Sequence, residues 1–447
     1  EALGVKLAVD VNSGAVHVLD DLTYRLLPLV EPPMAEHCPP ELLSRLPEYR
    51  TEAVEEGWQD LRELAGNGLL FVEDDYVDPA AATALQQSAP IKALCLHVSH
   101  DCNLRCQYCF ASTGDFGTGR KIMDIETAKR AIDFVIQRSG SRRNIEVDFF
   151  GGEPLMAMDT VKATVAYARS IEKKAGKCFR FTITTNGVLL DDENIDYINR
   201  EMSNAVLSLD GRLQVNDRMR KTVNGKGSYE VIVPKFQKLV AGRGTKDYYL
   251  RGTFTHYNLD FAEDVMHMAD LGFRNVSVEP VVGEETCGYA LKDEDLPVVL
   301  EQYEKLAEKL KDRTDVNFFH FNVDLAQGPC VIKRLRGCGA GCEYVAVTPE
   351  GDIYPCHQFV GNPAYKIGRL SDGSFDMELS HRFSCLNIYT REECRDCWAR
   401  FYCSGGCSAS NLLVNGDIKK PNHVGCEMER KRLECAIALK ALAAGMG

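Results

Sequence analysis

Residues 93–110 read ALCLHVSHDCNLRCQYCF, an apolar strand pattern that runs directly into three closely spaced cysteines, Cys102, Cys106 and Cys109. A structural zinc ion takes four ligands and commonly uses paired Cys-x-x-Cys units, so a single triplet fits zinc poorly. Three thiolates suit a four-iron cluster in which one iron stays open for another ligand. The stretch therefore predicts an iron–sulfur site in the loop after a buried strand, with zinc as the weaker alternative.

The region that begins at residue 93 alternates strand and helix patterns. Six such units in succession predict an α/β fold with a parallel sheet and helical crossovers, here a partial (β/α)6 barrel. Sites in these folds lie at the carboxyl ends of the strands, so we expect the triplet at the barrel mouth. The expected strands cover residues 93–99, 144–150, 178–185, 205–210, 248–255 and 275–282, and a helical pattern follows each of them.

The composition narrows the class of protein. The chain has 447 residues and a net charge of −13, which argues against nucleic acid or an anionic membrane as the main partner. No apolar run reaches the roughly 18 residues of a membrane helix, and the amino-terminal residues lack a signal-peptide pattern, so we expect a cytoplasmic protein. In a reducing compartment, most of the 18 cysteines are better explained as metal ligands than as disulfides.

Two further regions flank the expected barrel. Residues 5–20 alternate around an Asn-Ser-Gly turn, which predicts a hairpin, and helical patterns follow at 22–30, 41–49 and 51–70. Eleven cysteines lie between Cys330 and Cys435, in a turn-rich region where little regular structure is expected before a final helix. We therefore expect an amino-terminal α+β domain at 1–78, a linker at 79–92, the barrel at 93–320 and a cysteine-rich module at 321–447.

The triplet, with Phe110 after it, resembles the cluster motif of the radical S-adenosylmethionine (SAM) superfamily. Gly151-Gly152-Glu153-Pro154, at the end of the second strand, resembles the GGEP motif of that superfamily. The resemblance implies that the triplet holds a catalytic 4Fe-4S cluster whose open iron is chelated by SAM. It also implies a set of cofactor contacts, although turns and structural ion pairs remain alternatives for these residues: Phe110, Gly151, Gly152, Glu153, Ser208, Asp210, Arg220 and Arg251.

The carboxyl-terminal cysteines resemble the SPASM extension of the same superfamily. Its pattern is a cysteine, then Gly-x4-Cys, then Cys-x2-Cys-x5-Cys-x3-Cys, then a last cysteine, and this chain matches it at every position. The resemblance implies two auxiliary 4Fe-4S clusters. The distal cluster takes Cys394, Cys397, Cys403 and Cys426, and the nearer one takes Cys338, Cys356 and Cys407.

One cysteine of this region has two open interpretations. Cys342 either completes the nearer cluster or leaves one of its irons free for a substrate thiolate, and spacing does not decide between them. The seven remaining cysteines are expected to be small buried apolar residues rather than ligands. They are Cys38, Cys95, Cys178, Cys287, Cys330, Cys385 and Cys435.

The amino-terminal region has a looser resemblance. Residues 16–30, two helical patterns and GLLFV at 68–72 are similar to the small peptide-recognition element of enzymes that mature ribosomally made peptides. Such an element binds a leader peptide by β-augmentation, in which the peptide adds a strand to an exposed sheet edge. The alternative is an ordinary winged-helix-like packing domain, and the local acidity disfavours a role with DNA.

Together these resemblances imply a radical SAM maturase of a Cys-rich precursor peptide, similar to the six-cysteine (SCIFF) maturases that install thioether crosslinks. Such an enzyme uses three 4Fe-4S clusters, SAM and a reductant protein such as flavodoxin or ferredoxin. A deoxyadenosyl radical takes hydrogen from a peptide carbon, and a cysteine sulfur then bonds to that carbon. The alternatives are an anaerobic sulfatase-maturating enzyme, which makes formylglycine, and a non-catalytic iron–sulfur electron-transfer protein.

Overall fold

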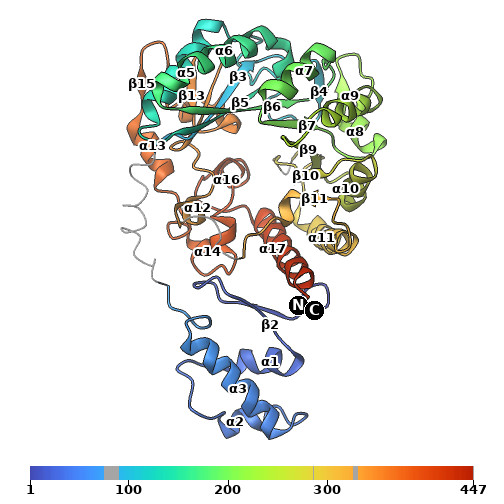
Figure 1. Ribbon diagram of the computed structural model, residues 1–447, viewed down its shortest axis with the longest axis vertical. Helices are drawn as coiled ribbons and strands as arrows, with labels where there is room; N and C mark the ends of the chain where they lie inside the picture. Colours follow the sequence, from blue (N-terminus) through green and yellow to red (C-terminus); the bar gives the residue numbers. More distant parts are fainter. Residues whose placement is uncertain (75–89, 285, 326–330, 446–447) are drawn as a thin grey trace.

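A mixed sheet of eleven strands forms the body of the protein (Figure 1), in a computed structural model that describes residues 1–74, 90–284, 286–325 and 331–445. Its order is β11-β10-β9-β7-β6-β5-β3-β12-β13-β14-β15. The strands from β11 to β3 are all parallel, and their order follows the chain, which confirms the expected partial barrel. They are β3 (Ala93–Ser99), β5 (Asn144–Gly151), β6 (Cys178–Thr185), β7 (Asn204–Ser208), β9 (Asp247–Phe254), β10 (Asn275–Pro280) and β11 (Asn317–Phe318).

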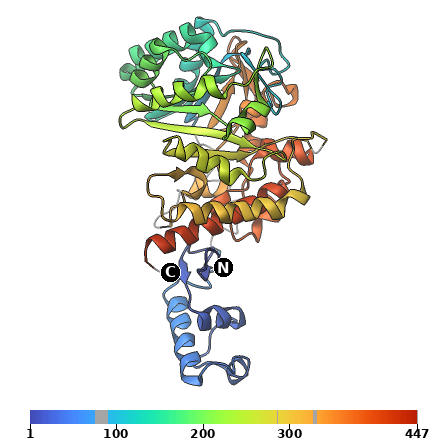
Figure 2. The same ribbon diagram turned by 90° about the vertical axis from the view of Figure 1, so that its right-hand side faces the viewer.

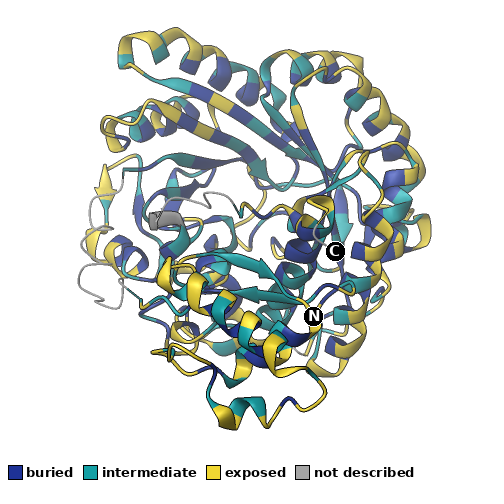
Figure 3. Ribbon diagram, turned by 60° about the horizontal axis from the view of Figure 1, so that its bottom comes forward, coloured by how far each residue is buried: buried dark blue, intermediate teal, exposed yellow. Residues whose placement is uncertain are grey.

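Helices cover the outside of the barrel, with exposed residues on their outer faces and buried residues in the sheet (Figure 3). Leu94, Leu96 and Val98 of β3 are fully buried in the core that the strands share with these helices. Among the described residues, no helix combines the length and the apolar character that a bilayer crossing needs. The covering helices are α5 (Ile125–Arg138), α6 (Met158–Ala175), α7 (Asp192–Glu201), α9 (Tyr229–Ala241), α10 (Phe261–Asp270) and α11 (Leu296–Leu310).

A small antiparallel pair at the barrel mouth is not visible in the sequence pattern. β4 (Leu104–Cys106) leaves the loop after β3 and pairs with β8 (Arg220–Thr222), which follows the short helix α8 (Leu213–Met219). Both strands have only three residues, which is too short for a periodicity to register. This pair ties the cysteine triplet to the segment after β7.

The cysteine-rich region is more regular than the sequence suggests, so the expectation of little regular structure there is wrong. β12 (Tyr344–Val347) pairs in parallel with β3, and three antiparallel strands follow it: β13 (Asp352–Tyr354), β14 (Gly368–Arg369) and β15 (Ser374–Phe375). An open barrel leaves the backbone groups of its first strand unpaired, and β12 supplies the partners for that edge. The helices of the region are α12 (Val331–Arg336), α13 (Met377–Ser384), α14 (Glu392–Arg395), α15 (Arg400–Cys403), α16 (Ser408–Asn415) and α17 (His423–Ala443).

A buried carboxylate reinforces the joint between the barrel and this region. Glu343 forms ion pairs with Lys92, just before β3, and with Arg336 of α12, and its side chain is only 7% exposed. The backbone carbonyl of Glu343 also accepts hydrogen bonds from the N–H groups of Lys92 and Ala93, at 2.7 and 3.1 Å. Glu343 therefore links the start of the first barrel strand to the cysteine-rich region.

The amino-terminal residues form a separate body below the barrel, with both chain ends close to its junction with the rest of the protein (Figures 1 and 2). The expected hairpin is confirmed, because β1 (Leu7–Val9) pairs antiparallel with β2 (Val16–Val18). Leu26 and Trp58 lie in a core distinct from that of the barrel. The helices are α1 (Asp21–Leu26), α2 (Pro40–Leu43) and α3 (Thr51–Gly66).

This body contacts the rest of the protein through both apolar and polar side chains. Leu7, Val9 and Val16 of the hairpin pack against the main core. Arg400 donates to Asp74 at 3.1 Å and to Asn12 at 2.5 Å, and the Tyr389 hydroxyl donates to Asp74 at 2.8 Å. Most of the expected linker at 79–92 lies outside the described residues, and the bounds of the four expected segments stay a prediction.

The joint at Glu343 gives a stability prediction. Glu343→Gln removes the carboxylate charge that pairs with Lys92 and with the buried guanidinium of Arg336. We therefore expect the free energy of unfolding to fall by about 3 kcal/mol. The midpoint of unfolding in guanidinium chloride measures this loss. Glu350→Gln is the matched control, because Glu350 pairs at 3.6 Å with a half-exposed Lys121, and we expect less than about 1 kcal/mol there. Equal effects of the two substitutions would contradict a structural role for the joint.

Candidate functional site

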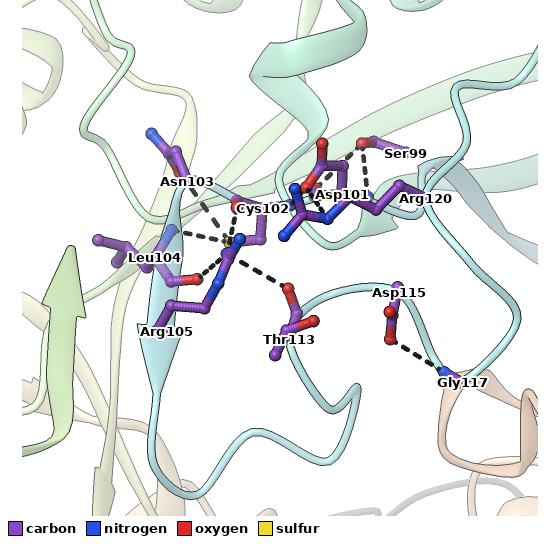
Figure 4. A network of polar contacts seen from close by, with 10 residues as sticks. All are labelled: Ser99, Asp101, Cys102, Asn103, Leu104, Arg105, Thr113, Asp115, Gly117 and Arg120. Atoms are coloured by element: carbon purple, nitrogen blue, oxygen red, sulfur yellow. Dashed lines mark hydrogen bonds and ion pairs between the residues drawn. The ribbon is translucent and has the colours of Figure 1, made fainter. Parts of the chain in front are cut away.

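The cysteine triplet lies between β3 and α5, at the carboxyl end of the first barrel strand. Figure 4 shows Cys102 and its neighbours in this loop. The pairing of β4 with β8 sets Cys106 opposite Arg220. The backbone N–H of Leu104 donates to Cys102 Sγ at 3.4 Å, and the guanidinium of Arg105 donates to the Cys102 carbonyl at 2.5 Å. The loop is thus shaped by contacts that the chain makes with itself.

Two glycines after β5 allow the backbone to cross this loop at close range. The N–H of Gly152 donates to the Ser99 carbonyl at 2.7 Å, and the N–H of Glu153 donates to the Asp101 carbonyl at 2.8 Å. A Cβ on Gly151 would lie 2.1 Å from the Ser99 carbonyl oxygen, and one on Gly152 would lie 2.2 Å from that of Asp101. Only glycine fits at these two positions, so the first half of the GGEP sequence has a steric explanation.

Glu153 is a buried carboxylate, 1% exposed, that fixes the next turn. It accepts hydrogen bonds from the Thr185 hydroxyl at 2.7 Å and from the N–H of Asn186 at 2.8 Å. The side chain of Asn186 in turn donates to Asn103 at 2.8 Å and lies 3.6 Å from Cys102 Sγ. Glu153 therefore holds the residues after β6 against the cysteine loop, and its expected contact with the cofactor stays a prediction.

Arg220 is a buried cation beside the triplet, 7% exposed. Its Nη1 donates to the Tyr108 hydroxyl at 2.9 Å, and that hydroxyl donates to the Asp210 carboxylate at 2.7 Å. Asp210 also accepts from the N–H of Thr253 and lies 3.9 Å from the Arg220 guanidinium. Among the described residues, Arg220 Nε has no hydrogen-bond partner. One donor of this guanidinium is thus left for an additional ligand.

These residues surround a cavity of about 150 Å³. It brings together residues that the sequence analysis selected from the ends of β5 and β7, from β8 and from the cysteine loop. The selected residues that line it are Cys102, Cys106, Cys109, Phe110, Gly151, Gly152, Glu153, Ser208 and Arg220. Asp210 lies next to the Arg220 guanidinium but does not line this cavity. Arg251 does not line it either.

The three thiols are buried and close to one another. Burial raises the pKa of Cys102 to about 12 and that of Cys106 to about 11, and it also raises the pKa of Cys109. Negative charge on each thiol raises the pKa of another member of the triplet, whereas the Arg220 cation acts in the opposite direction on all three. Ligation of metal requires thiolates, and the Arg220 charge favours them here.

A larger cavity of about 380 Å³ lies between the barrel and the cysteine-rich region. Arg251 of β9 and Glu279 of β10 line it from the barrel, with Arg251 Nη2 3.6 Å from Glu279 Oε1. Cys403, Cys407 and Cys426 line it from the other side. Arg251 therefore faces the auxiliary cysteines rather than the triplet cavity.

One short segment of the chain lies close to both cavities. Phe110 and Phe150 line the smaller one, and the ring of His357 lies 5.4 and 4.9 Å from theirs, measured between centroids. His357 follows Cys356, and the next residue, Gln358, lines the larger cavity. The short segment after β13 thus contacts both spaces.

The auxiliary cysteines fall into two groups in the structure. Burial raises the pKa of Cys394, Cys403 and Cys426 in one group and of Cys356 and Cys407 in the other, and negative charge on other cysteines of the same group raises each of these pKa values further. One group contains Cys394, Cys397, Cys403 and Cys426, and the other contains Cys338, Cys356 and Cys407. This division is the one that the sequence analysis assigned to the distal and nearer clusters, and the assignment as ligands stays a proposal.

Two of these cysteines sit at helix starts. Cys407 is the N-cap of α16, and Cys426 lies in the first turn of α17, which Asn422 caps with its side-chain oxygen. The N-terminus of a helix carries partial positive charge and favours a thiolate over a thiol. The helical ends of this region are therefore suited to metal-ligating cysteines.

Cys342 lies beside the nearer group. Its thiol is 3.3 Å from the Gly339 carbonyl oxygen, and burial raises its pKa to about 11, with a contribution from Cys338. The N–H of Gly341 donates to the Pro355 carbonyl at 3.0 Å, which brings this loop next to Cys356. Cys342 is thus near enough for either of its two interpretations.

The other cysteines divide by exposure. Cys38, Cys95 and Cys435 are buried as expected, whereas Cys178, Cys287 and Cys385 are only partly buried. Cys330 lies outside the described residues. Within the described ranges, no three His, Cys, Asp or Glu side chains converge closely enough to hold a single metal ion. This observation concerns single metal ions and not a four-iron cluster, in which each iron takes one cysteine.

Two side chains of the barrel interior were not selected from the sequence. Tyr108 lies between Cys106 and Cys109 in the sequence, and its hydroxyl joins Asp210 to Arg220. Asp148 lies on β5, on the same strand face as the cavity residue Phe150, and burial raises its pKa to about 7. A carboxylate on the inner face of an apolar strand is the signal that points to it.

Parts of this chain are similar to known protein families and to characterised enzymes. A profile described as the radical SAM superfamily matches residues 96–242, and one described as an iron–sulfur cluster-binding domain, SPASM, matches residues 338–398. The radical SAM cyclopropyl synthase TigE of Paramaledivibacter caminithermalis is 21% identical over 77% of this chain and 73% of its own length. A cysteine-type anaerobic sulfatase-maturating enzyme of Clostridium perfringens is 24% identical, over 71% and 89%. The mycofactocin maturase MftC of Mycolicibacterium smegmatis is 26% identical, over 75% and 82%.

Solved structures show the same fold. The structure of anSMEcpe with bound AdoMet and a peptide has a TM-score of 0.66 and 20% identity, and the match covers 80% of this chain and all of that one. The structure of Streptococcus suis SuiB bound to precursor peptide SuiA has a TM-score of 0.55 and 17% identity, over 94% and 96%. At these identities the likeness concerns the fold alone.

The glycine crossing gives a prediction about metal binding. Gly152→Ala forces the turn after β5 away from Asp101, so the cysteine loop should no longer hold metal. After anaerobic reconstitution, we expect this variant to lose as much iron as the variant in which Cys102, Cys106 and Cys109 are all alanine. Iron and acid-labile sulfide per chain measure the loss.

Gly66→Ala is the control, because a Cβ there meets no atom within 4 Å. It should bind as much iron as the unmodified chain. Normal iron content in Gly152→Ala would contradict the importance of this contact.

Proposed function

We propose that this chain, which carries a radical SAM domain and a SPASM iron–sulfur domain, is a peptide-modifying enzyme that installs thioether crosslinks in a ribosomally made, Cys-rich precursor peptide. One observation carries the proposal. One chain segment links the triplet cavity to the larger cavity lined by auxiliary cysteines, because His357 contacts the rings of Phe110 and Phe150 in the first and the next residue, Gln358, lines the second. A radical centre and a sulfur-binding centre then face a shared substrate space.

The residues of the small cavity suit SAM and a cluster. Cys102, Cys106 and Cys109 would hold three irons, and Arg220, with its unpartnered Nε, suits a carboxylate. When bound, the cluster and SAM supply one-electron reductive cleavage chemistry, which belongs to the cofactors. The chain itself orients them: the glycine crossing fixes the loop, and Tyr108 and Asp210 aim the Arg220 guanidinium.

The larger cavity suits the peptide. Arg251 and Glu279 offer one positive and one negative group from adjacent strand ends, so polar parts of a peptide find partners on the barrel side. On the opposite side, a substrate cysteine sulfur would approach the nearer auxiliary cluster, held by Cys338, Cys356 and Cys407. Cys342 decides whether that cluster has an open iron, since its thiol lies beside Cys338.

Two partners complete the proposal. The amino-terminal body would bind the leader of the precursor through a strand edge of its hairpin. A reductant protein such as flavodoxin or ferredoxin would deliver the electron. We place the enzyme in the cytoplasm, where a reducing environment preserves the many thiols and clusters.

The experiment uses the reconstituted full chain under anaerobic conditions, with SAM, dithionite and the precursor peptide encoded next to its gene. We expect deoxyadenosine and a peptide mass lower by two hydrogens per crosslink, with the crosslinked cysteines protected from alkylation. Replacing Cys102 by alanine removes a cluster ligand, so deoxyadenosine should fall to background.

Other outcomes redirect the assignment. No deoxyadenosine from reconstituted protein would leave a non-catalytic electron-transfer role. The relatives include a sulfatase-maturating enzyme, and a peptide aldehyde in place of a crosslink would favour that activity. A peptide without its leader tests the amino-terminal body, because unchanged turnover would remove its proposed role.

A further inference from the structure

Arg391 is a buried arginine, 4% exposed, at the start of the segment that carries the distal cysteine group. The N–H of Cys394 donates to its carbonyl at 3.0 Å. Its guanidinium donates to the carbonyl of Gly405 and to the hydroxyl of Ser408, the latter at 2.9 Å. The side chain is thus hydrogen-bonded to the loop that runs from Cys403, in the distal group, to Cys407, in the nearer group.

The chain makes room for this guanidinium. Gly405 has φ +90°, and a Cβ there would lie 2.4 Å from Arg391 Nη1. Any larger residue at this position would collide with the guanidinium or strain the backbone. Glycine at position 405 therefore leaves space for the Arg391 guanidinium and also allows the backbone turn before Cys407.

The partners of Arg391 are neutral oxygen atoms. Over the parts of the chain that the structure describes, no carboxylate forms an ion pair with Arg391, and its Nε has no hydrogen-bond partner. Two other buried arginines of this region do have carboxylates, because Arg336 pairs with Glu343 and Arg400 with Asp74. The partly buried Arg432 likewise pairs with Glu429. A buried cation without a counter-ion is costly, so its balancing charge must come from another source.

The thiolates of both cysteine groups supply such a charge. Burial lowers the pKa of Arg391, and negative charge on four cysteines opposes this effect. Cys394 and Cys403 belong to the distal group, and Cys407 and Cys338 belong to the nearer one. Arg391 therefore stands in the field of both groups at once.

We propose that Arg391 is the shared counter-ion of the two auxiliary clusters and that its positive charge raises the reduction potential of both. This inference rests on the proposed function only in taking the two cysteine groups as cluster ligands. Reduction adds one electron to a cluster and makes it more negative, without forming or breaking a bond to Arg391. A fixed cation nearby stabilises the reduced form more than the oxidised form, and the low polarity of a buried site strengthens the effect.

The test is a redox titration followed by electron paramagnetic resonance, with dithionite as the electron donor. The chain carries alanine at Cys102, Cys106 and Cys109, so that only the auxiliary clusters give a signal. In this background we expect Arg391→Met to make the reduction of each auxiliary cluster at least tenfold less favourable, which is about 59 mV per one-electron step.

Two variants separate charge from hydrogen bonding. Arg391→Lys keeps the positive charge but loses the planar fork of donors, and the equilibrium constant for reduction of each auxiliary cluster should stay within threefold of that of the unmodified background. Arg395→Met is the matched control, because Arg395 is exposed and only four residues away. Its solvated charge should leave both potentials unchanged.

Each outcome bears on the proposal. Unchanged potentials in Arg391→Met, or a shift of only one cluster, would overturn a shared counter-ion. If Arg391→Met binds no auxiliary iron, Arg391→Lys decides: normal clusters with normal potentials support the proposal, and loss of iron in both variants assigns Arg391 to loop structure and overturns it. Absence of auxiliary clusters in the alanine background would instead refute their assignment, and a failed crosslinking assay with shifted potentials would refute only the proposed function.

Discussion

The backbone crossing between the exits of β3 and β5 is the constraint on which the site depends. Gly151 and Gly152 pass so close to the Ser99 and Asp101 carbonyls that a methyl group at either position would overlap an oxygen atom. This contact fixes the beginning of the cysteine loop. Glu153 then extends the same crossing to the end of β6, so that three strand ends are joined around one cavity.

Charge around this cavity follows from the same arrangement. Arg220 reaches the triplet only because β8 pairs with β4, and Tyr108 and Asp210 hold its guanidinium from behind. The three buried thiols have raised pKa values, and this cation favours the ionised form of all three, together with backbone hydrogen bonds. Loop shape and electrostatics thus come from one small antiparallel pair at the barrel mouth.

The second organising contact is the parallel pairing of β12 with the open edge of the barrel. It makes one continuous sheet of two regions that the sequence presents as separate domains. The hairpin that begins with β12 places the loop of Cys342 beside Cys356, and the segment after it touches both cavities. Arg391 adds an electrostatic link between the two auxiliary groups, so the cysteine-rich region is organised by strands, helix ends and one buried cation.

Periodicity and motif spacing predicted much of this from the sequence. All six barrel strands were expected within two residues of their bounds, because a long run of strand–helix units leaves few alternatives. The nine selected residues around the triplet meet in one cavity because strand ends share one rim. The β4–β8 pair, β12 and the partners of Arg220 were missed, since three-residue strands have no readable period and long-range pairing leaves no local signal. Arg251 lines the larger cavity, and its expected contact with the cofactor stays a prediction, since a strand pattern gives a face but not the neighbour across it.

The central claim is that a radical generated at the triplet cavity takes hydrogen from a carbon of the peptide. It is tested most directly by anaerobic turnover of a precursor peptide that carries deuterium on its carbon atoms, followed by mass spectrometry of the released deoxyadenosine. Our account predicts deuterium in the deoxyadenosine, in proportion to the crosslinks formed. Crosslinked peptide accompanied only by unlabelled deoxyadenosine would contradict it.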